Sequence, residues 1–226
     1  MHVTAFQERF VAYSNLTCVL SKTETQELKH VYFSETTMSM ELSQGLSRKD
    51  ASRSQGELRA VSQGGPEWDT FLSWSVDYIL TYWPTADEGK GREAFSAEYA
   101  EYLKSRVAEG GRGLFLLSAH GKDVGIANVY LDERMLPGNP RAEKSLHISE
   151  YSILPEFRKL GHGTRFLEPL KAWGLGCGAI GLVVEVDKGL EPANSFWSSL
   201  GLSLDTTGTR NVYYSKNLNS FVPPLR

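Results

Sequence analysis

The chain has 226 residues, a formal net charge of −3 at pH 7 and an apolar fraction of 41%, with a sequence pI near 6.0. This length is enough for one large domain with an extension, and for a sizeable hydrophobic core. The slight acidity argues against general binding to nucleic acid or to an anionic membrane, because both attract basic surfaces.

Cysteine and histidine spacing gives no sign of a disulfide framework or a metal site. Cys18 and Cys177 are far apart and lack CxxC spacing, and the five histidines show neither HxH nor HExxH spacing. No apolar run approaches the ~20 residues of a membrane span, and the N-terminal MHVTAFQERF has no basic start followed by an apolar segment. We therefore expect a cytoplasmic protein without a secretory signal, membrane span or metal.

The first 55 residues differ in composition from the rest of the chain. Residues 34–55 contain eight Ser or Thr and almost no large apolar side chain beyond Leu and Met. Such a segment buries too little surface to offset its ordering entropy. We predict an N-terminal extension with a Ser/Thr-rich linker over 1–55, a globular domain over 56–218 and a tail over 219–226. A regulatory or protein-interaction role for the extension remains open.

Two helices are predicted early in the domain. Pro66, followed by the acids of Glu67–Asp69, is typical of a helix start, and Trp83-Pro84 marks its end. A second helix runs from Arg92 to Glu109 and stops at two glycines. The aromatic stripe of the first helix is most simply core packing.

Strands make up most of the remaining pattern. Leu182–Val186 is continuously apolar apart from one acid, which predicts a buried central strand. Residues 132–144 are charged and contain proline, and are expected to be a loop. A short helix is predicted at Pro192–Leu200. The other predicted strands are Glu57–Ser62, Gly113–Ala119, Asp123–Leu131, Leu146–Leu154, Leu202–Thr206 and Val212–Ser215. A tight turn at His120–Lys122 joins the strands that end at Ala119 and begin at Asp123. The strands Leu202–Thr206 and Val212–Ser215 form a hairpin.

The chain is organised around residues 145–176. A strand reaches Leu154, and Pro155 cannot donate to a ladder, so the strand is expected to splay from its neighbour there. A loop with Gly161 and Gly163 follows, and then a helical pattern. Because glycine permits close backbone approach and the first helical amides are free, this strand–loop–helix arrangement predicts a phosphate site.

These residues resemble motif A of the GCN5-related N-acetyltransferase (GNAT) superfamily, Arg/Gln-x-x-Gly-x-Gly/Ala after a strand that ends in a proline-containing turn. Arg158, Gly161 and Gly163 match the motif, and Ile153, Pro155 and Phe157 match its lead-in. The predicted element order also agrees with that superfamily over about residues 56–218. The resemblance implies an α/β (α+β) fold with a central mixed, mostly antiparallel sheet of six to seven strands, flanked by helices and splayed at the central strand. One or two aromatic rings of the first helix would then line the acceptor cleft.

The activity implied by the resemblance is transfer of an acetyl group from acetyl-CoA to a primary amine. The amides of the motif A loop would hold the pyrophosphate, and amides near the end of the central strand would bind the pantetheine arm and polarise the thioester. The residues expected to bind acetyl-CoA are Ile153, Leu154, Arg158, Lys159, Leu160, Gly161, His162, Gly163, Thr164, Asn194 and Trp197. Within this set, His162 occupies a free motif position and is expected to face solvent.

Two residues of the central strand are candidate bases. Glu150 lies three residues before Ile153, where a glutamate is common in the superfamily, and it would deprotonate the acceptor directly or through an ordered water. His147 is the second candidate, with an ordinary pKa near neutrality. The alternative to a catalytic role is a structural one, in which the Glu150 carboxylate pairs with a residue of a neighbouring strand. The two are three apart, so in a regular strand they point to opposite faces, unless a bulge intervenes.

The second motif departs from the superfamily pattern at the step that protonates the leaving thiolate. Residues 193–202 match A-x-x-F-Y-x-x-L-G-F, but Trp197 replaces the tyrosine and Leu190 stands where asparagine is common. Indole has no acidic proton of useful pKa. The proton donor stays open between water and the side chains of Tyr213, Tyr214, Tyr151 and Ser195.

A different class of function therefore remains possible, a non-catalytic acyl-CoA-binding sensor or interaction module. The GxGxxG at Gly176–Gly181 follows a helix and precedes a strand, the reverse of a dinucleotide site, and is interpreted as a turn. The sequence names no acceptor: a polyamine, an aminoglycoside, a peptide amine or a lysine all fit. The chain is expected to be a monomer or a homodimer.

Overall fold

The structure is a computed structural model that describes residues 56–135, 142–207 and 211–220. They fall in the second of the chain's two units, Ser54–Arg226. The predicted extension over 1–55 and residues 221–226 of the predicted tail lie outside the described residues, so these domain boundaries stay predictions. Within the ranges that are described, no helix is both long and apolar enough to cross a membrane.

One seven-stranded sheet forms the centre of this unit, in the order β1-β2-β3-β4-β5-β7-β6. Neighbouring strands are antiparallel, apart from β4 and β5, which run parallel. This mixed, mostly antiparallel sheet confirms the predicted fold class, and β5 has the central position that its apolar run predicted. The strands are β1 (Glu57–Ala60), β2 (Arg112–Ala119), β3 (Lys122–Met135), β4 (Ala142–Ile153), β5 (Gly181–Asp187), β6 (Ser203–Thr207) and β7 (Asn211–Asn217).

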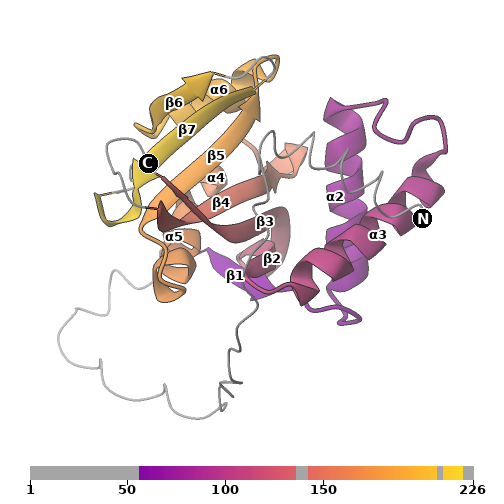
Figure 1. Cartoon of the computed structure of the whole chain (residues 1–226). Coiled ribbons are helices and arrows are strands. Elements are labelled where there is room, and N and C mark those ends of the chain that lie inside the picture. The colour runs from indigo at the N-terminus through magenta and orange to yellow at the C-terminus, as the bar shows by residue number, and fades with distance from the viewer. Residues whose placement is uncertain (1–55, 136–141, 208–210, 221–226) are drawn as a thin grey trace, which may run out of the picture. The chain divides into compact units, whose positions relative to one another are not determined.

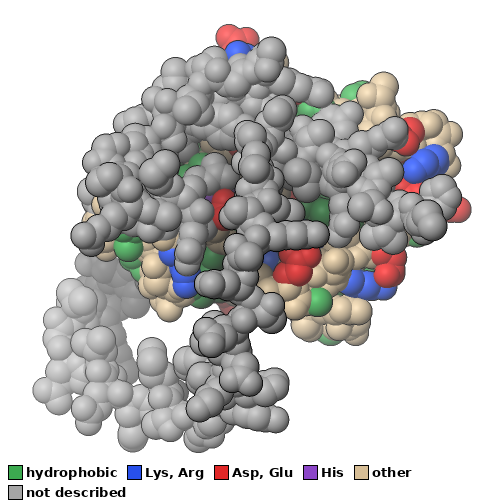
Figure 2. Space-filling model, viewed as in Figure 1, with side chains coloured by type: hydrophobic (Ala, Val, Ile, Leu, Met, Phe, Trp, Pro, Cys, Tyr) green, Lys and Arg blue, Asp and Glu red, His purple; other side chains and the backbone are tan. Residues whose placement is uncertain are grey.

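Helices cover the sheet. Figure 1 shows α2 and α3 packed together, away from α5 and α6. The α-helices are α2 (Trp68–Tyr82), α3 (Arg92–Ala108), α4 (His162–Arg165), α5 (Leu167–Gly176) and α6 (Glu191–Ser199), and two short 3₁₀ turns lie at Pro155–Phe157 (η1) and Leu218–Ser220 (η2). The ion pair from Arg92 of α3 to Asp77 of α2, at 2.6 Å, helps join the first two helices. Acidic and basic side chains lie next to one another on the described part of the face in Figure 2.

Two apolar layers sandwich the sheet. On the α5 side, Leu146 and Ile148 of β4 belong to the same buried cluster as Phe166 and Leu170. On the α2–α3 side, a second set of side chains is buried, and these helices contact β2 and β3. That set comprises Phe71, Val76, Ile79, Phe95, Tyr99 and Leu103.

The hairpins follow the predicted turns, with one correction. His120 and Gly121 take φ values of 52° and 73° in a two-residue turn between paired Ala119 and Lys122. The loop predicted over 132–144 is wrong in extent, because β3 continues to Met135 and β4 begins at Ala142. The register places Glu133 opposite Lys144 and Arg134 opposite Glu143. The charged sequence on both sides of the turn is therefore part of the paired strands.

The predicted splay is present, but its cause is a bulge. β4 pairs with β5 only as far as Ile148–Val184 among the described strands, while its pairing with β3 continues to Ile153–Gly125. The register with β3 shifts between Asn128 and Val129, which leaves Ser149 as an extra residue in β4. Separation from β5 therefore starts at Ser149, five residues before the Leu154–Pro155 bond at which proline was expected to end pairing.

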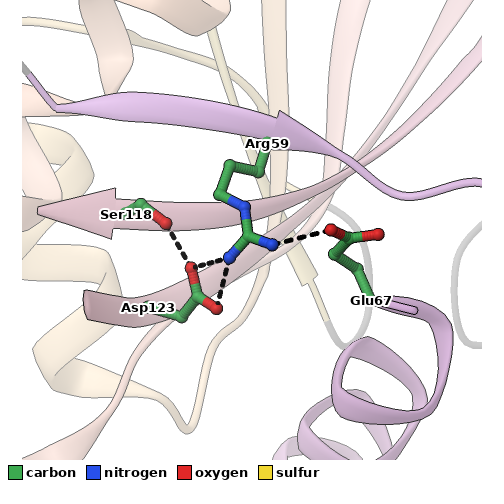
Figure 3. Close-up of polar contacts among 4 residues, drawn as sticks. All are labelled: Arg59, Glu67, Ser118 and Asp123. Carbon is green, nitrogen blue, oxygen red and sulfur yellow. Dashed lines mark hydrogen bonds and ion pairs between the residues drawn. The ribbon is translucent and has the colours of Figure 1, made fainter. Parts of the chain in front are cut away.

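An ion-pair network joins one end of the sheet to α2. Arg59 of β1 donates to both carboxylate oxygens of Asp123 on β3, at 2.9 and 2.8 Å, and to Glu67 at 2.6 Å. Ser118 of β2 also donates to Asp123. Figure 3 shows the guanidinium between the two carboxylates. Because Glu67 directly precedes α2, one side chain ties the edge strand, the hairpin and the helix start together.

We expect Arg59→Met to lower the midpoint of thermal unfolding, because two carboxylates lose their common partner while the apolar stem is kept. The matched control is Arg106→Met, which removes an ion pair between Arg106 and Glu109, three residues apart at the end of α3. Such local surface pairs contribute little, so the control should unfold close to wild type. Equal midpoints for both variants by calorimetry would contradict a bridging role for Arg59.

Candidate active site

The loop after β4 has the backbone form of a phosphate-binding turn. Lys159 and Gly161 take positive φ values of 59° and 80°, and Gly161 is the residue before α4. Phe166 is also helical and joins α4 to α5, with its amide bonded to the carbonyl of His162 at 3.1 Å. The amides at the start of α4 have no acceptor within the helix and are available to an anion.

Contacts beneath the loop fix its position. The Tyr151 hydroxyl donates to the carbonyl oxygen of Gly163 at 2.6 Å. A Cβ built on Gly163 would lie 3.4 Å from the ring of Phe196, so α6 closes the space under the loop. Burial raises the pKa of Tyr151, which keeps the phenol protonated as a donor. Tyr151 thus supports the loop, and this contact makes it a poor candidate for the proton donor.

The edge of β4 that faces β5 offers backbone groups next to this loop. The Leu154 amide donates to the carbonyl of Val124 on β3 at 2.9 Å, so the expectation of a free amide at Leu154 is wrong. Because backbone groups alternate along a strand, those of Ile153 and Tyr151 point away from β3, to the side that β5 has left. Arg158 Nε donates to the Ile153 carbonyl at 2.8 Å, which places the first residue of the motif against this edge.

Glu150 lies on the α2–α3 side of β4, in a buried polar cluster. Its side chain is 8% exposed. Oε1 accepts hydrogen bonds from the Tyr99 hydroxyl of α3 and from Nδ2 of Asn128, the latter at 3.4 Å. Oε2 is buried and has no hydrogen-bond partner among the described residues. The carboxylate therefore has one occupied and one vacant oxygen.

The bulge brings His147 to the same side as Glu150. Leu146 and Ile148 belong to the α5-side cluster, and after Ser149 it is Tyr151 and Ile153 that pack against that cluster. The alternation of faces is thus reset at Ser149, and positions 147 and 150 share the opposite face. The expectation of opposite faces applied to a regular strand, and the bulge, which was the alternative left open, places both side chains on one face.

Further contacts connect the two candidate bases. His147 stacks on Tyr130 of β3 with a centroid distance of 4.8 Å. The Arg112 guanidinium lies 4.9 Å from the centre of the same ring and donates to Oδ1 of Asn128 at 2.6 Å. Asn128 in turn donates to Glu150, so the chain of contacts runs without a gap from His147 to Glu150.

Burial governs the ionisation of this cluster. It raises the pKa of Glu150 above its ordinary value, although donated hydrogen bonds and the Arg112 charge oppose the rise. Burial, followed by the Glu150 charge, also raises the pKa of Tyr99. A carboxylate with a raised pKa is a stronger base than one in water, which suits proton abstraction from an ammonium group.

Aromatic side chains at the end of α2 form a group that contacts the end of β5. Tyr78, Tyr82 and Trp83 contact one another edge to face, with centroid distances from 5.2 to 6.2 Å. Trp83 Nε1 donates to Oδ2 of Asp187 at the end of β5, at 3.3 Å. Burial raises the pKa of Tyr78; the Glu150 charge adds to the rise and Arg158 opposes it. These rings therefore lie beside the gap between β4 and β5.

The remaining predicted site residues lie as follows. His162, expected to face solvent, is 7% exposed and lies between the rings of Phe157 and Phe166, because α4 turns it inward. Burial lowers its pKa, and the positive charges of Arg165 and His120 lower it further. Leu160, by contrast, is 60% exposed on the loop, and Thr164 lies within α4.

Residues of the second motif have mainly structural contacts. The side-chain amide of Asn194 donates to the carbonyls of Asp187 and Leu190, at 2.9 and 3.0 Å, which holds the turn between β5 and α6. Trp197 is 4% exposed within the core cluster and contacts Tyr151. Tyr213 pairs with Glu185 across β7 and β5, and its side chain lies outside the described residues.

The rings that sequence reasoning missed are Tyr78, Tyr82 and Tyr99. Their helices were predicted, but these side chains were not singled out, since a tyrosine in an amphipathic helix is usually core. The signal that was present is chemical: each carries a hydroxyl next to an apolar stripe, and a buried hydroxyl needs a partner.

A mixed sheet that opens between two parallel strands, next to a glycine loop at a helix start, defines the fold class of GNAT acyltransferases. Three solved structures share this fold. Apo FdhC, a nucleotide-linked sugar GNAT, is 18% identical with a TM-score of 0.55, over 74% of this chain and 90% of that one. The PaiA N-acetyltransferase from Thermoplasma acidophilum, in complex with coenzyme A, is 11% identical with a TM-score of 0.51, over 72% and 98%. The aminoglycoside N-acetyltransferase AAC(6')-Iy, in complex with CoA, is 17% identical with a TM-score of 0.50, over 69% and 92%.

The family is shown by sequence as well. The model of the acetyltransferase (GNAT) family matches residues 74–202, more than half of the chain. This chain therefore belongs to the GNAT family of acetyltransferases, whose acetyl donor is acetyl-CoA. A search of curated proteins found no match.

Proposed function

We propose that the protein transfers the acetyl group of acetyl-CoA to a primary amine, with Glu150 as the base. The observation that carries this proposal is the position of a buried carboxylate with one vacant oxygen, on the same strand as the splayed edge and five residues before the η1 turn that leads into the loop. A non-catalytic acyl-CoA sensor would have no need of a carboxylate kept basic by burial.

The donor would bind along the loop and the open edge of β4. Amides of Lys159, Gly161 and Gly163 would hold the pyrophosphate, with Arg158 adding charge. The pantetheine arm would extend along Ile153, and a backbone amide at this edge would stabilise the oxygen of the tetrahedral intermediate. The vacated β5 side of β4 is the strip of backbone that such an arm needs.

The reaction then balances as follows. The acceptor enters as an ammonium ion, and the Glu150 carboxylate takes one proton from it, directly or through one water. The amine nitrogen attacks the thioester carbonyl carbon, and the bond from carbon to sulfur breaks with its electron pair on sulfur. A second proton leaves the nitrogen, and the thiolate takes up a proton to become the free thiol of CoA. His147, on the same side of β4, is the alternative base.

Tyr78 is our candidate for the group that stabilises the departing thiolate in place of the usual tyrosine. It comes from α2, its electrostatics couple it to both Glu150 and Arg158, and its raised pKa keeps it a hydrogen-bond donor. Trp197 occupies the core and Tyr151 is engaged with Gly163, so neither is as well placed.

Tyr78→Phe should lower kcat by about 10²-fold, the lower end of what one such donor contributes, with little change in acetyl-CoA affinity. Tyr82→Phe is the matched control, since it removes a hydroxyl from the same aromatic group and should change kcat less. Single-turnover rates at saturating acetyl-CoA would separate the two variants. An unchanged rate in Tyr78→Phe would exclude Tyr78 and assign the protonation to water or to another side chain.

The function is tested by release of free thiol from acetyl-CoA in the presence of a panel of amines. The panel should contain polyamines, aminoglycosides, amino sugars and lysine peptides, because the solved relatives are named for different acceptors. We expect at least one primary amine to accelerate release well above the rate in buffer. Tight acetyl-CoA binding without acceleration by any panel member would favour the sensor.

A further inference from the structure

More polar side chains surround Glu150 than a general base needs, and their hydrogen bonds go to one of its two carboxylate oxygens. The Oε1 atom of the carboxylate accepts hydrogen bonds from Tyr99 and from Asn128, and the Oε2 atom accepts none from the described residues. Tyr99 belongs to α3 and Asn128 to β3, so two separate elements hold the same oxygen. Two donors on one oxygen fix the plane of the carboxylate as well as its position.

Arg112 decides which way the Asn128 amide points. Its NH1 group donates to Oδ1 of Asn128 at 2.6 Å. A guanidinium has no acceptor, so Oδ1 must face Arg112 and the NH₂ group must face Glu150. Arg112 is itself held over the Tyr130 ring. A flipped amide would present its oxygen to the carboxylate and repel it.

We propose that Tyr99, Asn128 and Arg112 are positioning residues that engage Oε1 of Glu150 and leave Oε2 as the atom that takes the proton from the acceptor amine. This inference rests on the proposed function. It adds a chain of hydrogen bonds that runs from Arg112 through Asn128 to Glu150. The Tyr99 hydroxyl supplies a second hydrogen bond to the same carboxylate.

The surroundings of the carboxylate agree with this division of roles. Ser75 and Tyr78 of α2 complete its shell, and the Ser75 hydroxyl lies beside the carboxylate without meeting hydrogen-bond geometry in this structure. The charged and titratable groups around Glu150 are thus Tyr78 from α2, Tyr99 from α3 and Arg112 from β2. The donors stabilise the ionised carboxylate against the effect of burial.

The test is Tyr99→Phe, which keeps the ring stacked between Phe95 and Tyr102 and removes only the hydroxyl. Loss of a donor to a carboxylate favours the protonated form. We therefore expect the acid limb of the kcat/KM profile to move to higher pH, and kcat/KM at neutral pH to fall by about 10- to 100-fold, as for a misplaced catalytic group. Arg112→Met should move the limb in the same direction. A residue with a merely structural role would lower the rate without moving the limb.

Tyr151→Phe is the matched control, since it removes a buried hydroxyl from the same strand but from the opposite face. It should leave the acid limb in place, and any effect should appear in acetyl-CoA affinity. In a double-mutant cycle, Tyr99→Phe should add little to Glu150→Gln, because the hydroxyl acts through the carboxylate. Full additivity of the two substitutions would overturn the proposal.

A second readout separates failure of this inference from failure of the proposed function. Carbon-13 NMR of labelled glutamate, assigned by comparison with Glu150→Gln, follows ionisation of Glu150 without turnover. Its titration should move to higher pH in Tyr99→Phe and stay in place in Tyr151→Phe. An unmoved titration in Tyr99→Phe would refute the positioning role even in an active enzyme. A moved titration in a protein that turns over no amine would support the positioning and refute the transferase.

Discussion

Glu150→Gln is expected to lower kcat/KM for acetyl transfer by about 10²- to 10⁴-fold at neutral pH, the usual contribution of a general base. Glutamine keeps the size and an oxygen for the donors from Tyr99 and Asn128, but it cannot take a proton. Acetyl-CoA affinity should stay near that of wild type, because the loop and the Ile153 edge are untouched. Stopped-flow kinetics and calorimetric titration with acetyl-CoA would measure the two quantities separately.

The same variant should be at least as stable as wild type. Because the pKa of Glu150 is raised in the folded state, the folded protein binds its proton more tightly than the unfolded chain. Wild type therefore loses stability as pH rises from the pKa of Glu150 in the unfolded chain to its pKa in the folded protein. At higher pH this stability is not regained. Glutamine removes this dependence, so the difference in thermal midpoint should grow in favour of the variant across that window.

His147→Ala is the companion measurement for the choice of base. The two side chains share a face and a contact chain, and burial raises the pKa of Glu150, which makes its carboxylate a stronger base. We expect His147→Ala to lose less activity than Glu150→Gln. The reverse ranking would assign the base to His147, and two small effects would place the base elsewhere.

Gly161→Glu is expected to abolish measurable acetyl-CoA binding while the protein still folds. Gly161 has a φ of 80° and no atom within 4 Å of a built Cβ, so a side chain there would project into open space at the start of α4. The carboxylate would lie where the donor's phosphates are expected, and the two negative charges would repel. Calorimetric titration with acetyl-CoA measures the loss.

Gly110→Glu is the control for backbone strain. Gly110 has a φ of 82° and is equally open, but it lies after α3 rather than in the loop. Both substitutions should cost about 1–2 kcal/mol of folding free energy from the left-handed backbone, and only Gly161→Glu should lose the donor. Normal acetyl-CoA affinity in a folded Gly161→Glu protein would show that the phosphates bind elsewhere.

The fold and the shape of the loop after β4 were predictable because their signals are local. The strand predicted over Leu146–Leu154 is β4, the run Leu182–Val186 marked a buried strand, and Gly161 has the positive φ that glycine permits. The strand-loop-helix order alone was enough to predict an anion site.

The arrangement around Glu150 could not be read from sequence, because it depends on non-local pairing. The bulge at Ser149 depends on register with β3, and it is this bulge that starts the splay and brings His147 and Glu150 to one face. Tyr99 and Arg112 lie 51 and 38 residues before Glu150 along the chain, in elements whose contact with β4 depends on the tertiary fold. A charged hairpin such as Glu133–Lys144 looks like a loop until cross-strand pairs are known.

The most direct test of acetyl transfer to an amine is the stoichiometry of its two products, measured by mass spectrometry of the acceptor alongside free CoA. With the best amine of the panel, one acetamide should form for each CoA released, at a rate that Glu150→Gln abolishes without loss of acetyl-CoA binding. CoA release without an acetylated amine, or equal product from wild type and Glu150→Gln, would contradict an N-acetyltransferase that uses Glu150 as its base.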